Sequence, residues 1–366
     1  MNKAGIYIHI PFCKSKCPYC DFYSMRLTDS AAEDYTASLQ KRIAELKEKY
    51  PLDADTLYLG GGTPSLIGAE NIAKIVEAAS VFGNFDEITV ECNPSCVEDG
   101  FFEKVSAVGV NRISLGLQSA SDSERRSLGR LAGVKEAERC IRSAQDAGIK
   151  NISLDVMIGI PNQTLESLDE TLTFCVSSGA VHISAYMLKL EEDTFFYKNQ
   201  SRLNLPDDDF TADAYLRMVS FLENAGFNQY EISNFSKDGF ESRHNLKYWL
   251  GDEYLGIGPA AHSFAGGKRF YFPRDIEYFM NGGEPLADGD GGDIKEYIML
   301  RLRLKSGVVY DEIIKRGCEN KINLLRQKAE FFAENGFAEA DNCGFCLTPK
   351  GFLVSNTIIE IFMNVF

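Results

Sequence analysis

Residues 11–22 read PFCKSKCPYCDF, and they place Cys13, Cys17 and Cys20 at the spacing C-x3-C-x2-C directly after the apolar run Ile6–Ile10. A closed zinc site has four protein ligands, and an ordinary 4Fe-4S cluster takes one cysteine for each iron. Three cysteines on one loop therefore leave one iron of such a cluster open. That iron could be chelated by a small molecule with an amine and a carboxylate, as methionine-type ligands have. We expect a 4Fe-4S cluster on these three residues.

The flanks of the cysteine loop carry a family resemblance. The cysteine spacing, with Tyr19 before the last cysteine, resembles the cluster loop of the radical S-adenosylmethionine superfamily. Residues 7–13, YIHIPFC, are similar to the branch that contains the oxygen-independent coproporphyrinogen III oxidases and the heme chaperones of the HemW family. The oxidases carry a fourth cysteine two residues after the third, and this chain has Phe22 there, as the chaperones do. The resemblance also adds Tyr7 and Tyr19 to the expected cofactor site.

The composition is that of a soluble globular protein. The chain has 366 residues, of which 45% are hydrophobic and 25% charged, enough for one large domain and a smaller one. A net charge of -15 argues against a wide basic face that binds nucleic acid or anionic lipid. No apolar run approaches the roughly 20 residues of a membrane span, and no secretory leader is evident. We expect a cytoplasmic protein with small-molecule or protein partners.

The other seven cysteines have a plainer interpretation. Cys92, Cys140 and Cys175 each stand alone inside an apolar segment, where a free cysteine in a reducing compartment is usually a small core residue. Cys343 and Cys346 form one C-x2-C pair, but no second pair or histidine is near them in the sequence. Packing is therefore the favoured interpretation of that pair.

The pattern of apolar runs predicts the fold. The runs are near-continuous, which is typical of strands buried on both faces, and helical patterns separate them, which predicts parallel βαβ units. We expect an α/β fold, an incomplete six-stranded (β/α) barrel within residues 1–235, with functional groups at the carboxyl ends of its strands. The superfamily resemblance implies the same open form. The six predicted strands are Ile6–Ile10, Thr56–Leu59, Ile88–Val90, Ile113–Leu117, Ile152–Ile158 and His182–Leu188.

A glycine loop, Gly60-Gly61-Gly62-Thr63-Pro64, follows the second predicted strand. Its backbone could approach a ligand closely, although a tight strand-to-helix turn would explain the glycines as well. By resemblance, Gly61, Gly62 and Thr63 belong to the segment that holds the methionyl amine of S-adenosylmethionine.

Polar residues stand in or after the later strands. Glu91 ends the third, Gln118 follows the fourth, and Asp155 lies within the fifth. A polar residue at a buried strand end must be paired or functional. Each of these, and Arg130 after them, could alone form a structural ion pair. By resemblance, the set of Glu91, Gln118, Arg130 and Asp155 matches positions that contact S-adenosylmethionine, and Tyr186 in the sixth strand is expected to line the same site.

Residues 243–249, RHNLKYW, set a histidine among aromatic residues. From the residues alone, a packed surface segment explains them. The pattern H-N-x2-Y-W resembles a heme chaperone motif that is linked to heme binding. Neutral imidazole is a common axial ligand of heme iron, so His244 is the first candidate and His262, in the glycine-rich residues 255–263, the second. Either could simply shape the pocket. The motif residues are His244, Asn245, Tyr248 and Trp249.

A run of glycine and aspartate, Asp288–Asp293, suggests a domain boundary, which makes residues 236–290 a connecting segment. Helical patterns and a hairpin in residues 291–366 predict a small C-terminal winged-helix-like α+β domain. Residues 294–366 contain ten Lys or Arg and nine Asp or Glu, too little net charge for a nucleic-acid footprint. Covering the barrel or docking a protein is the expected role.

Two functional hypotheses follow, and a third is weaker. The first is a heme chaperone that binds a 4Fe-4S cluster, S-adenosylmethionine and heme and delivers heme to a client, by resemblance a membrane-associated respiratory enzyme. The second is radical oxidative decarboxylation of coproporphyrinogen III in porphyrin biosynthesis. A zinc-stabilised interaction module would explain the cysteines but not the glycine loop. Phe22 and the H-N-x2-Y-W motif favour the first, so we expect no coproporphyrinogen oxidation.

Overall fold

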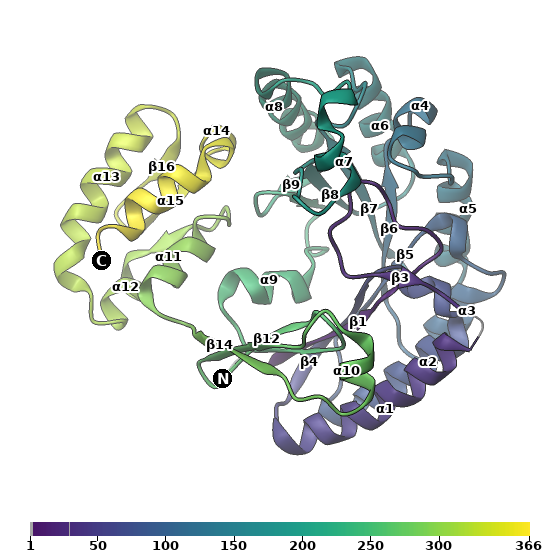
Figure 1. Cartoon of the computed structure of the whole chain (residues 1–366). Helices are drawn as coiled ribbons and strands as arrows, with labels where there is room; N and C mark the ends of the chain where they lie inside the picture. Colours follow the sequence, from purple (N-terminus) through teal and green to yellow (C-terminus); the bar gives the residue numbers. More distant parts are fainter. Residues whose placement is uncertain (1–2, 29) are drawn as a thin grey trace.

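One wide, open sheet forms the centre of the protein. The computed structural model describes residues 3–28 and 30–366. The sheet has 12 strands in the order β14-β13-β12-β11-β1-β4-β5-β6-β7-β8-β10-β9, and its two ends do not meet. Its seven central strands are parallel, and Figure 1 shows helices around their outer side. These strands are β11 (Tyr254–Ile257), β1 (Ala4–Ile10), β4 (Ala54–Gly61), β5 (Glu87–Cys92), β6 (Arg112–Gln118), β7 (Asn151–Ile158) and β8 (His182–Met187).

The outer helices connect the parallel strands, as the sequence pattern predicts. In α1 the buried residues Leu39, Ile43 and Leu46 recur at helical spacing, so one face of the helix packs on the sheet. The start of α8 is fixed by Asp207, whose carboxylate accepts a hydrogen bond from the Phe210 amide at 2.8 Å. The connecting helices are α1 (Ala31–Lys49), α2 (Ala69–Ala79), α3 (Phe101–Ala107), α4 (Asp122–Ser127), α5 (Val134–Asp146), α6 (Leu165–Ser177) and α8 (Asp208–Asn224).

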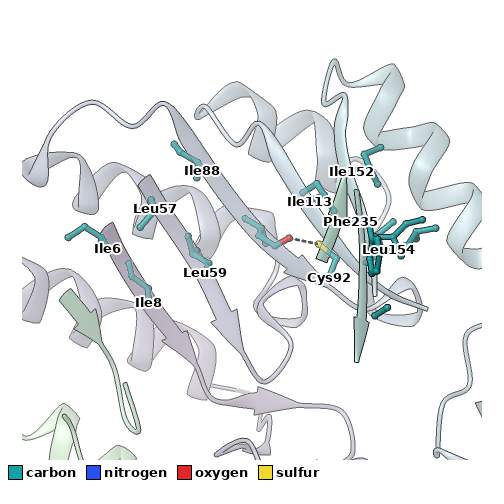
Figure 2. Close-up of a cluster of buried hydrophobic side chains, with 14 of the residues drawn as sticks. Ile6, Ile8, Leu57, Leu59, Ile88, Cys92, Ile113, Ile152, Leu154 and Phe235 are labelled. Atoms are coloured by element: carbon teal, nitrogen blue, oxygen red, sulfur yellow. Dashed lines mark hydrogen bonds between the residues drawn. The ribbon is translucent and has the colours of Figure 1, made fainter. Parts of the chain in front are cut away.

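The parallel strands are buried on both faces, but the two faces differ. Side chains such as Ile6, Leu57 and Ile113 belong to the apolar core (Figure 2), on the side that the helices cover. The alternate positions carry polar or aromatic residues that line the concave side. They include Tyr7 and His9 of β1, Thr56 and Tyr58 of β4, Glu87 and Glu91 of β5, Arg112 and Ser114 of β6, and Ser153 and Asp155 of β7.

Residues 236–290, expected as a connecting segment, largely continue the sheet. Strand β11 adds a seventh parallel strand beside β1, outside residues 1–235, in which the six strands were predicted. Three antiparallel strands then extend this edge, and the last takes up the start of the run Asp288–Asp293. Strands of so few residues show too little periodicity to be recognised in the sequence. They are β12 (His262–Ala265), β13 (Lys268–Tyr271) and β14 (Leu286–Asp290), with β9 (Asn228–Gln229) and β10 (Asn234–Ser236) at the opposite edge.

A short helix, α9 (Arg243–Leu250), occupies the concave side, between the barrel and the C-terminal unit in Figure 1. Its first turn rests on Glu87 of β5, whose carboxylate accepts hydrogen bonds from the amides of Arg243 at 3.1 Å and His244 at 2.9 Å. An acidic group at a helix N-terminus satisfies free amides and interacts favourably with the helix dipole. The H-N-x2-Y-W motif is therefore fixed to the centre of the sheet.

The C-terminal unit contains helices and a three-stranded sheet, the α+β kind expected. It is joined to the barrel by backbone hydrogen bonds from Ile232 to Arg303 at 2.9 Å and from Lys305 to Tyr230 at 3.0 Å. None of the helices in the described part of the chain combines the length and apolarity that a membrane span requires. The unit consists of α11 (Ile294–Arg301), β15 (Val308–Val309), α12 (Tyr310–Lys315), α13 (Ile322–Glu334), β16 (Ala338–Ala340), β17 (Gly344–Leu347), α14 (Pro349–Leu353) and α15 (Ser355–Met363).

Candidate cofactor site

A cavity of about 510 Å³ lies on the concave side, at the carboxyl ends of strands β4 to β8. We refer to it as the cofactor chamber. It is lined by the cysteine loop, by the glycine loop, by the four polar residues in or after the later strands and by one residue of α9. The parallel topology therefore brings together segments that are far apart in the sequence. The predicted site residues that line it are Cys13, Cys17, Tyr19, Cys20, Gly61, Gly62, Thr63, Glu91, Gln118, Arg130, Asp155, Tyr186 and Asn245.

The cysteine loop is closed on itself and presents three free thiols. Strands β2 (Phe12–Cys13) and β3 (Met25–Arg26) pair at its base, and the Cys20 amide donates to the Cys17 carbonyl at 3.1 Å. Cys13, Cys17 and Cys20 are each half-buried. Burial raises the pKa of the Cys20 thiol, and the neighbouring Cys17 and Cys13 thiols raise it further. Bound metal would offset the repulsion between the three thiolates, because metal ions stabilise the thiolate form of cysteine.

The three cysteines do not form a site for one metal ion. Among the residues that the structure describes, no three His, Cys, Asp or Glu side chains are grouped closely enough to hold a single ion. A 4Fe-4S cluster binds each cysteine to a different iron, so its ligands stand farther apart than the ligands of one ion do. The donor set, three thiols that face one chamber, therefore fits a cluster better than a structural zinc site.

The glycine loop is held against the cysteine loop by its backbone. The amides of Gly62 and Thr63 donate to the carbonyls of Ile10 and Phe12, both at 2.8 Å. A Cβ atom on Gly62 would stand 2.6 Å from the Phe12 carbonyl oxygen, so only glycine fits there. The tight turn that would explain the glycines is thus present, and the loop also lines the chamber. Since these two amides are used, carbonyl oxygens are what the loop can offer to a ligand's ammonium group.

Glu91 is the half-buried acid near the end of β5. It accepts hydrogen bonds from the Tyr58 hydroxyl at 2.8 Å and from the Gly61 amide at 3.1 Å. Burial raises the pKa of Glu91 to about 7. A carboxyl group with this pKa is costly to ionise, and a cationic ligand beside it would lower the cost.

Two further polar residues, one within β7 and one at the end of β6, complete the inner wall. Asp155 of β7 accepts a hydrogen bond from the Ser114 hydroxyl at 2.9 Å, and burial raises the pKa of Asp155. Gln118, the last residue of β6, has a left-handed backbone with φ of 71°, at an irregularity in the pairing of β6 with β7. A non-glycine residue held in this conformation stores strain, and such residues cluster at functional sites.

Arg130 connects the cysteine loop to the segment after β6. Its Nη2 and Nε atoms lie 3.0 and 3.3 Å from the Tyr19 hydroxyl oxygen, to which they donate. Tyr19 in turn packs against Phe196, with ring centroids 6.2 Å apart. The residue before the last cysteine is therefore held in position from two sides.

The H-N-x2-Y-W motif does not face one pocket. His244 is 1% exposed, its Nδ1 lies 2.9 Å from the Thr56 hydroxyl oxygen, and its Nε2 lies 2.8 Å from the Tyr248 hydroxyl oxygen. Both ring nitrogens are engaged within the protein, so an axial bond to heme iron would require one of these contacts to break. Trp249 lies under the Arg303 guanidinium of the C-terminal unit, 5.8 Å from the ring centroid.

A second cavity, of about 480 Å³, lies beside the chamber. We call it the aromatic cavity, because seven of its twelve lining residues are Tyr or Phe. Tyr7, Tyr248 and His262 of the predicted set line this cavity rather than the chamber. Phe22 lines both cavities.

Sequence reasoning missed several chamber residues on the inner face of the strands. Arg112 is 1% exposed, and its Nε and Nη1 atoms have no hydrogen-bond partner among the described residues. Alternation along each strand was the available signal, since Arg112 and Ser114 precede Gln118 by six and four positions, both even numbers. The missed lining residues include Tyr58, Arg112, Ser114, Met157 and Ser184.

Comparison with known proteins agrees with this architecture. A family model described as "Radical SAM superfamily" matches residues 7–175. The chain is similar to the protein named heme chaperone HemW in Bacillus subtilis, with 32% identity, and in Haemophilus influenzae and Escherichia coli, with 34% identity each. In all three comparisons the alignment covers 98% of both chains.

A solved structure shows the same fold. Coproporphyrinogen III oxidase (HemN) from Escherichia coli, described as a radical SAM enzyme, matches with a TM-score of 0.84 at 19% identity, over 100% of this chain and 91% of that one. Membership of the superfamily implies a 4Fe-4S cluster and S-adenosylmethionine, which the three thiols and the chamber fit. With near-complete coverage at 30% identity or more, the chain belongs to the HemW family of the radical S-adenosylmethionine superfamily.

Proposed function

We propose that the protein is a heme chaperone, which binds heme beside a 4Fe-4S cluster and S-adenosylmethionine and transfers the heme to an acceptor protein. The observation that carries this proposal is that three thiols, the glycine loop and two acidic residues of the strands line one chamber. The cysteine loop is followed by Phe22 rather than by a fourth cysteine. The names of the full-length relatives support the same function.

Each part of the chamber has a role in this proposal. Cys13, Cys17 and Cys20 hold the cluster, which when bound supplies an electron and an iron with an open coordination position. The carbonyls of the glycine loop and the Glu91 carboxylate suit the methionyl ammonium group, because both accept hydrogen bonds. Asp155 suits a ribose hydroxyl, which would add a donor to the one that Ser114 already provides.

Phe22 favours a chaperone over an oxidase. The family resemblance puts a cysteine here in the oxidases, and a thiol at this position would face the chamber. The phenylalanine ring is 66% exposed, although it is large and apolar, and it lines both cavities. An exposed ring between two cavities suits a surface that a flat ligand covers.

The kind of acceptor and the location of the chaperone belong to the same proposal. The acceptor is a protein that needs heme, and we place the chaperone in the cytoplasm. Residues 294–366 have ten basic and nine acidic side chains, so we assign no nucleic-acid role to the C-terminal unit. A docking surface for the acceptor is the role we propose for this unit.

The test is a heme titration of protein that has been reconstituted anaerobically with iron and sulfide. We expect saturable binding of one heme per chain, and the heme should be recovered unchanged after extraction. Failure to bind heme above the level of a protein of similar net charge would overturn the proposal.

A second function, oxidation of coproporphyrinogen III, is favoured by one observation. The oxidase from Escherichia coli has the same fold over the whole of this chain. A shared fold does not establish a shared reaction. Analysis of the products that the cluster-loaded protein forms from coproporphyrinogen III separates the two functions.

A further inference from the structure

We propose that the aromatic cavity is the heme-binding slot and that His262 is the axial ligand of the heme iron. The proposal rests on the heme chaperone function, and it places the heme beside the cofactor chamber rather than inside it. It also replaces His244 with a residue that is free to coordinate iron.

The walls of the cavity suit a flat aromatic ligand. Tyr7 of β1, Tyr248 of α9 and Tyr271 of β13 contribute rings from three different elements. A porphyrin is a broad apolar disc, and aromatic contacts add favourable energy beyond the burial of apolar area. The volume of about 480 Å³ lies within the usual range of small-molecule sites, about 300 to 1,000 Å³.

The histidines single out one iron ligand. The chain has four, and all lie in the described residues. His9 lines the aromatic cavity, but its Nδ1 lies 3.0 Å from the Tyr7 hydroxyl oxygen and its Nε2 lies 2.9 Å from the Tyr23 carbonyl oxygen. Burial also lowers the pKa of His9 to about 4. This imidazole is a structural member of the cavity wall.

His182 and His244 are excluded for the same reason. The ring nitrogens of His182 lie 2.7 Å from the Ser153 hydroxyl oxygen and 2.8 Å from the Tyr230 hydroxyl oxygen, and His182 lines neither cavity. The two contacts of His244, described above, occupy its nitrogens as well. Coordination by either residue would break a buried hydrogen bond.

His262 differs from the other three histidines in its exposure and in the contacts of its ring nitrogens. It begins β12, its side chain is 60% exposed, and no hydrogen bond of its Nε2 to a described residue is found. Its Nδ1 lies 3.7 Å from Asp288 Oδ2, and its ring stacks on Tyr271 with centroids 5.2 Å apart. A carboxylate near the second nitrogen is one of the groups that orient a metal-binding imidazole in other proteins.

The rim of the cavity offers a partner for a heme propionate. Arg274 lines the cavity and is exposed, with its Nη2 2.8 Å from Asp21 Oδ2. A propionate could join or replace Asp21 as the anionic partner of this guanidinium. Because Phe22 lines both cavities, heme in the slot would cover that exposed ring and leave the chamber free for S-adenosylmethionine.

The experiment compares two ligands, iron protoporphyrin IX and metal-free protoporphyrin IX, on cluster-loaded protein under anaerobic conditions. For His262→Ala we expect heme affinity to fall about tenfold or more, a loss of about 1.4 kcal/mol or more. The heme absorption band should move at the same time, because the axial ligand has changed. Affinity for the metal-free porphyrin should change less than about twofold, since that ring has no iron to coordinate.

Phe22→Ala is the matched control, because Phe22 is exposed and supplies ring contact but no ligand. It should weaken both porphyrins by similar factors and leave the heme spectrum in place. Iron content and circular dichroism should match the wild type for both variants.

Three outcomes separate the claims. An unchanged heme affinity and spectrum for His262→Ala would overturn the ligand assignment, while heme binding by the wild type would keep the chaperone function. Equal losses of heme and metal-free porphyrin in His262→Ala would also overturn it, because the residue would then act by packing. No heme binding by the wild type would instead refute the proposed function itself.

Discussion

Glu91→Gln tests the balance between stability and cofactor binding in the chamber. Glu91 is half-buried, and desolvation raises its pKa to about 7 from an ordinary value of 4.5. Between these two values the folded state holds a proton that the unfolded state has released, so stability falls as pH rises through this window and is constant above it. The difference of about 2.5 pKa units corresponds to a cost of about 3 kcal/mol at pH 8.

Glutamine stays neutral, so the substitution removes that cost. It also weakens one of the two hydrogen bonds, since a single amide oxygen cannot accept from both Tyr58 and Gly61 as well as a carboxylate does. Subtracting about 1 to 1.5 kcal/mol for this loss leaves an expected gain of about 1.5 to 2 kcal/mol at pH 8. At pH 4.5 the carboxyl is neutral in the folded state and half ionised in the unfolded state, so the cost falls to about 0.4 kcal/mol and the gain should vanish.

Binding of S-adenosylmethionine should change in the opposite direction. The ammonium group would lose a charged partner, which is worth about 1.5 to 3 kcal/mol. Urea unfolding of cluster-free protein at pH 8 and pH 4.5 measures the first effect, and isothermal titration of reconstituted protein measures the second.

Glu231→Gln is the matched control. Burial raises the pKa of Glu231 to about 7 as well, but this residue lines neither cavity. It should give a stability gain at pH 8 without any change in S-adenosylmethionine affinity. A loss of stability at pH 8 in Glu91→Gln, or an affinity equal to that of the wild type, would refute the reasoning.

Two further predictions concern the chamber. Alanine at Cys13, Cys17 or Cys20 should remove most of the iron and the broad visible absorption after reconstitution. Alanine at both Cys343 and Cys346 should leave the iron and the absorption intact. Full iron content in a single variant of the cysteine loop would refute the ligand assignment. Asp155→Ala should weaken S-adenosylmethionine by about 1 to 3 kcal/mol, the cost of deleting a buried hydrogen-bonding partner, and an unchanged affinity by isothermal titration would return Asp155 to a structural role.

Local pattern was enough to predict much of the fold. All six predicted strands exist, because their apolar runs are long and separated by helices. In a parallel sheet their carboxyl ends meet at one edge, so Glu91, Gln118 and Asp155 could be placed together without knowing a single contact. The thirteen predicted residues around the chamber follow from that rule and from the family resemblance.

What the sequence did not show has physical causes as well. Strands β11 and β12 have four residues each, and they are fixed by pairing of β11 with β1 and of β12 with β11 rather than by local periodicity. The sequence shows a histidine among aromatic residues, but it does not show that Thr56, which is 188 positions away, occupies the Nδ1 atom of His244. Which imidazole has a free ring nitrogen is decided by tertiary contacts, which the sequence does not show, and the choice of heme ligand therefore stays a proposal.

The polar inner face was the other omission. Strands buried on both sides were correctly predicted, but buried does not mean apolar when hydroxyl and carboxyl groups satisfy one another, as Ser114 and Asp155 do at 2.9 Å. Alternate positions of β4 to β7 would have indicated Tyr58 and Arg112 as chamber residues.

The most direct measurement of the central claim is a product analysis on one anaerobic preparation. Cluster-loaded protein is divided into two portions, one titrated with heme and the other given coproporphyrinogen III, S-adenosylmethionine and a reductant. A chaperone binds one heme per chain and forms no protoporphyrinogen, which is the result we predict. Formation of protoporphyrinogen over many turnovers per chain would contradict the account and identify an oxidase.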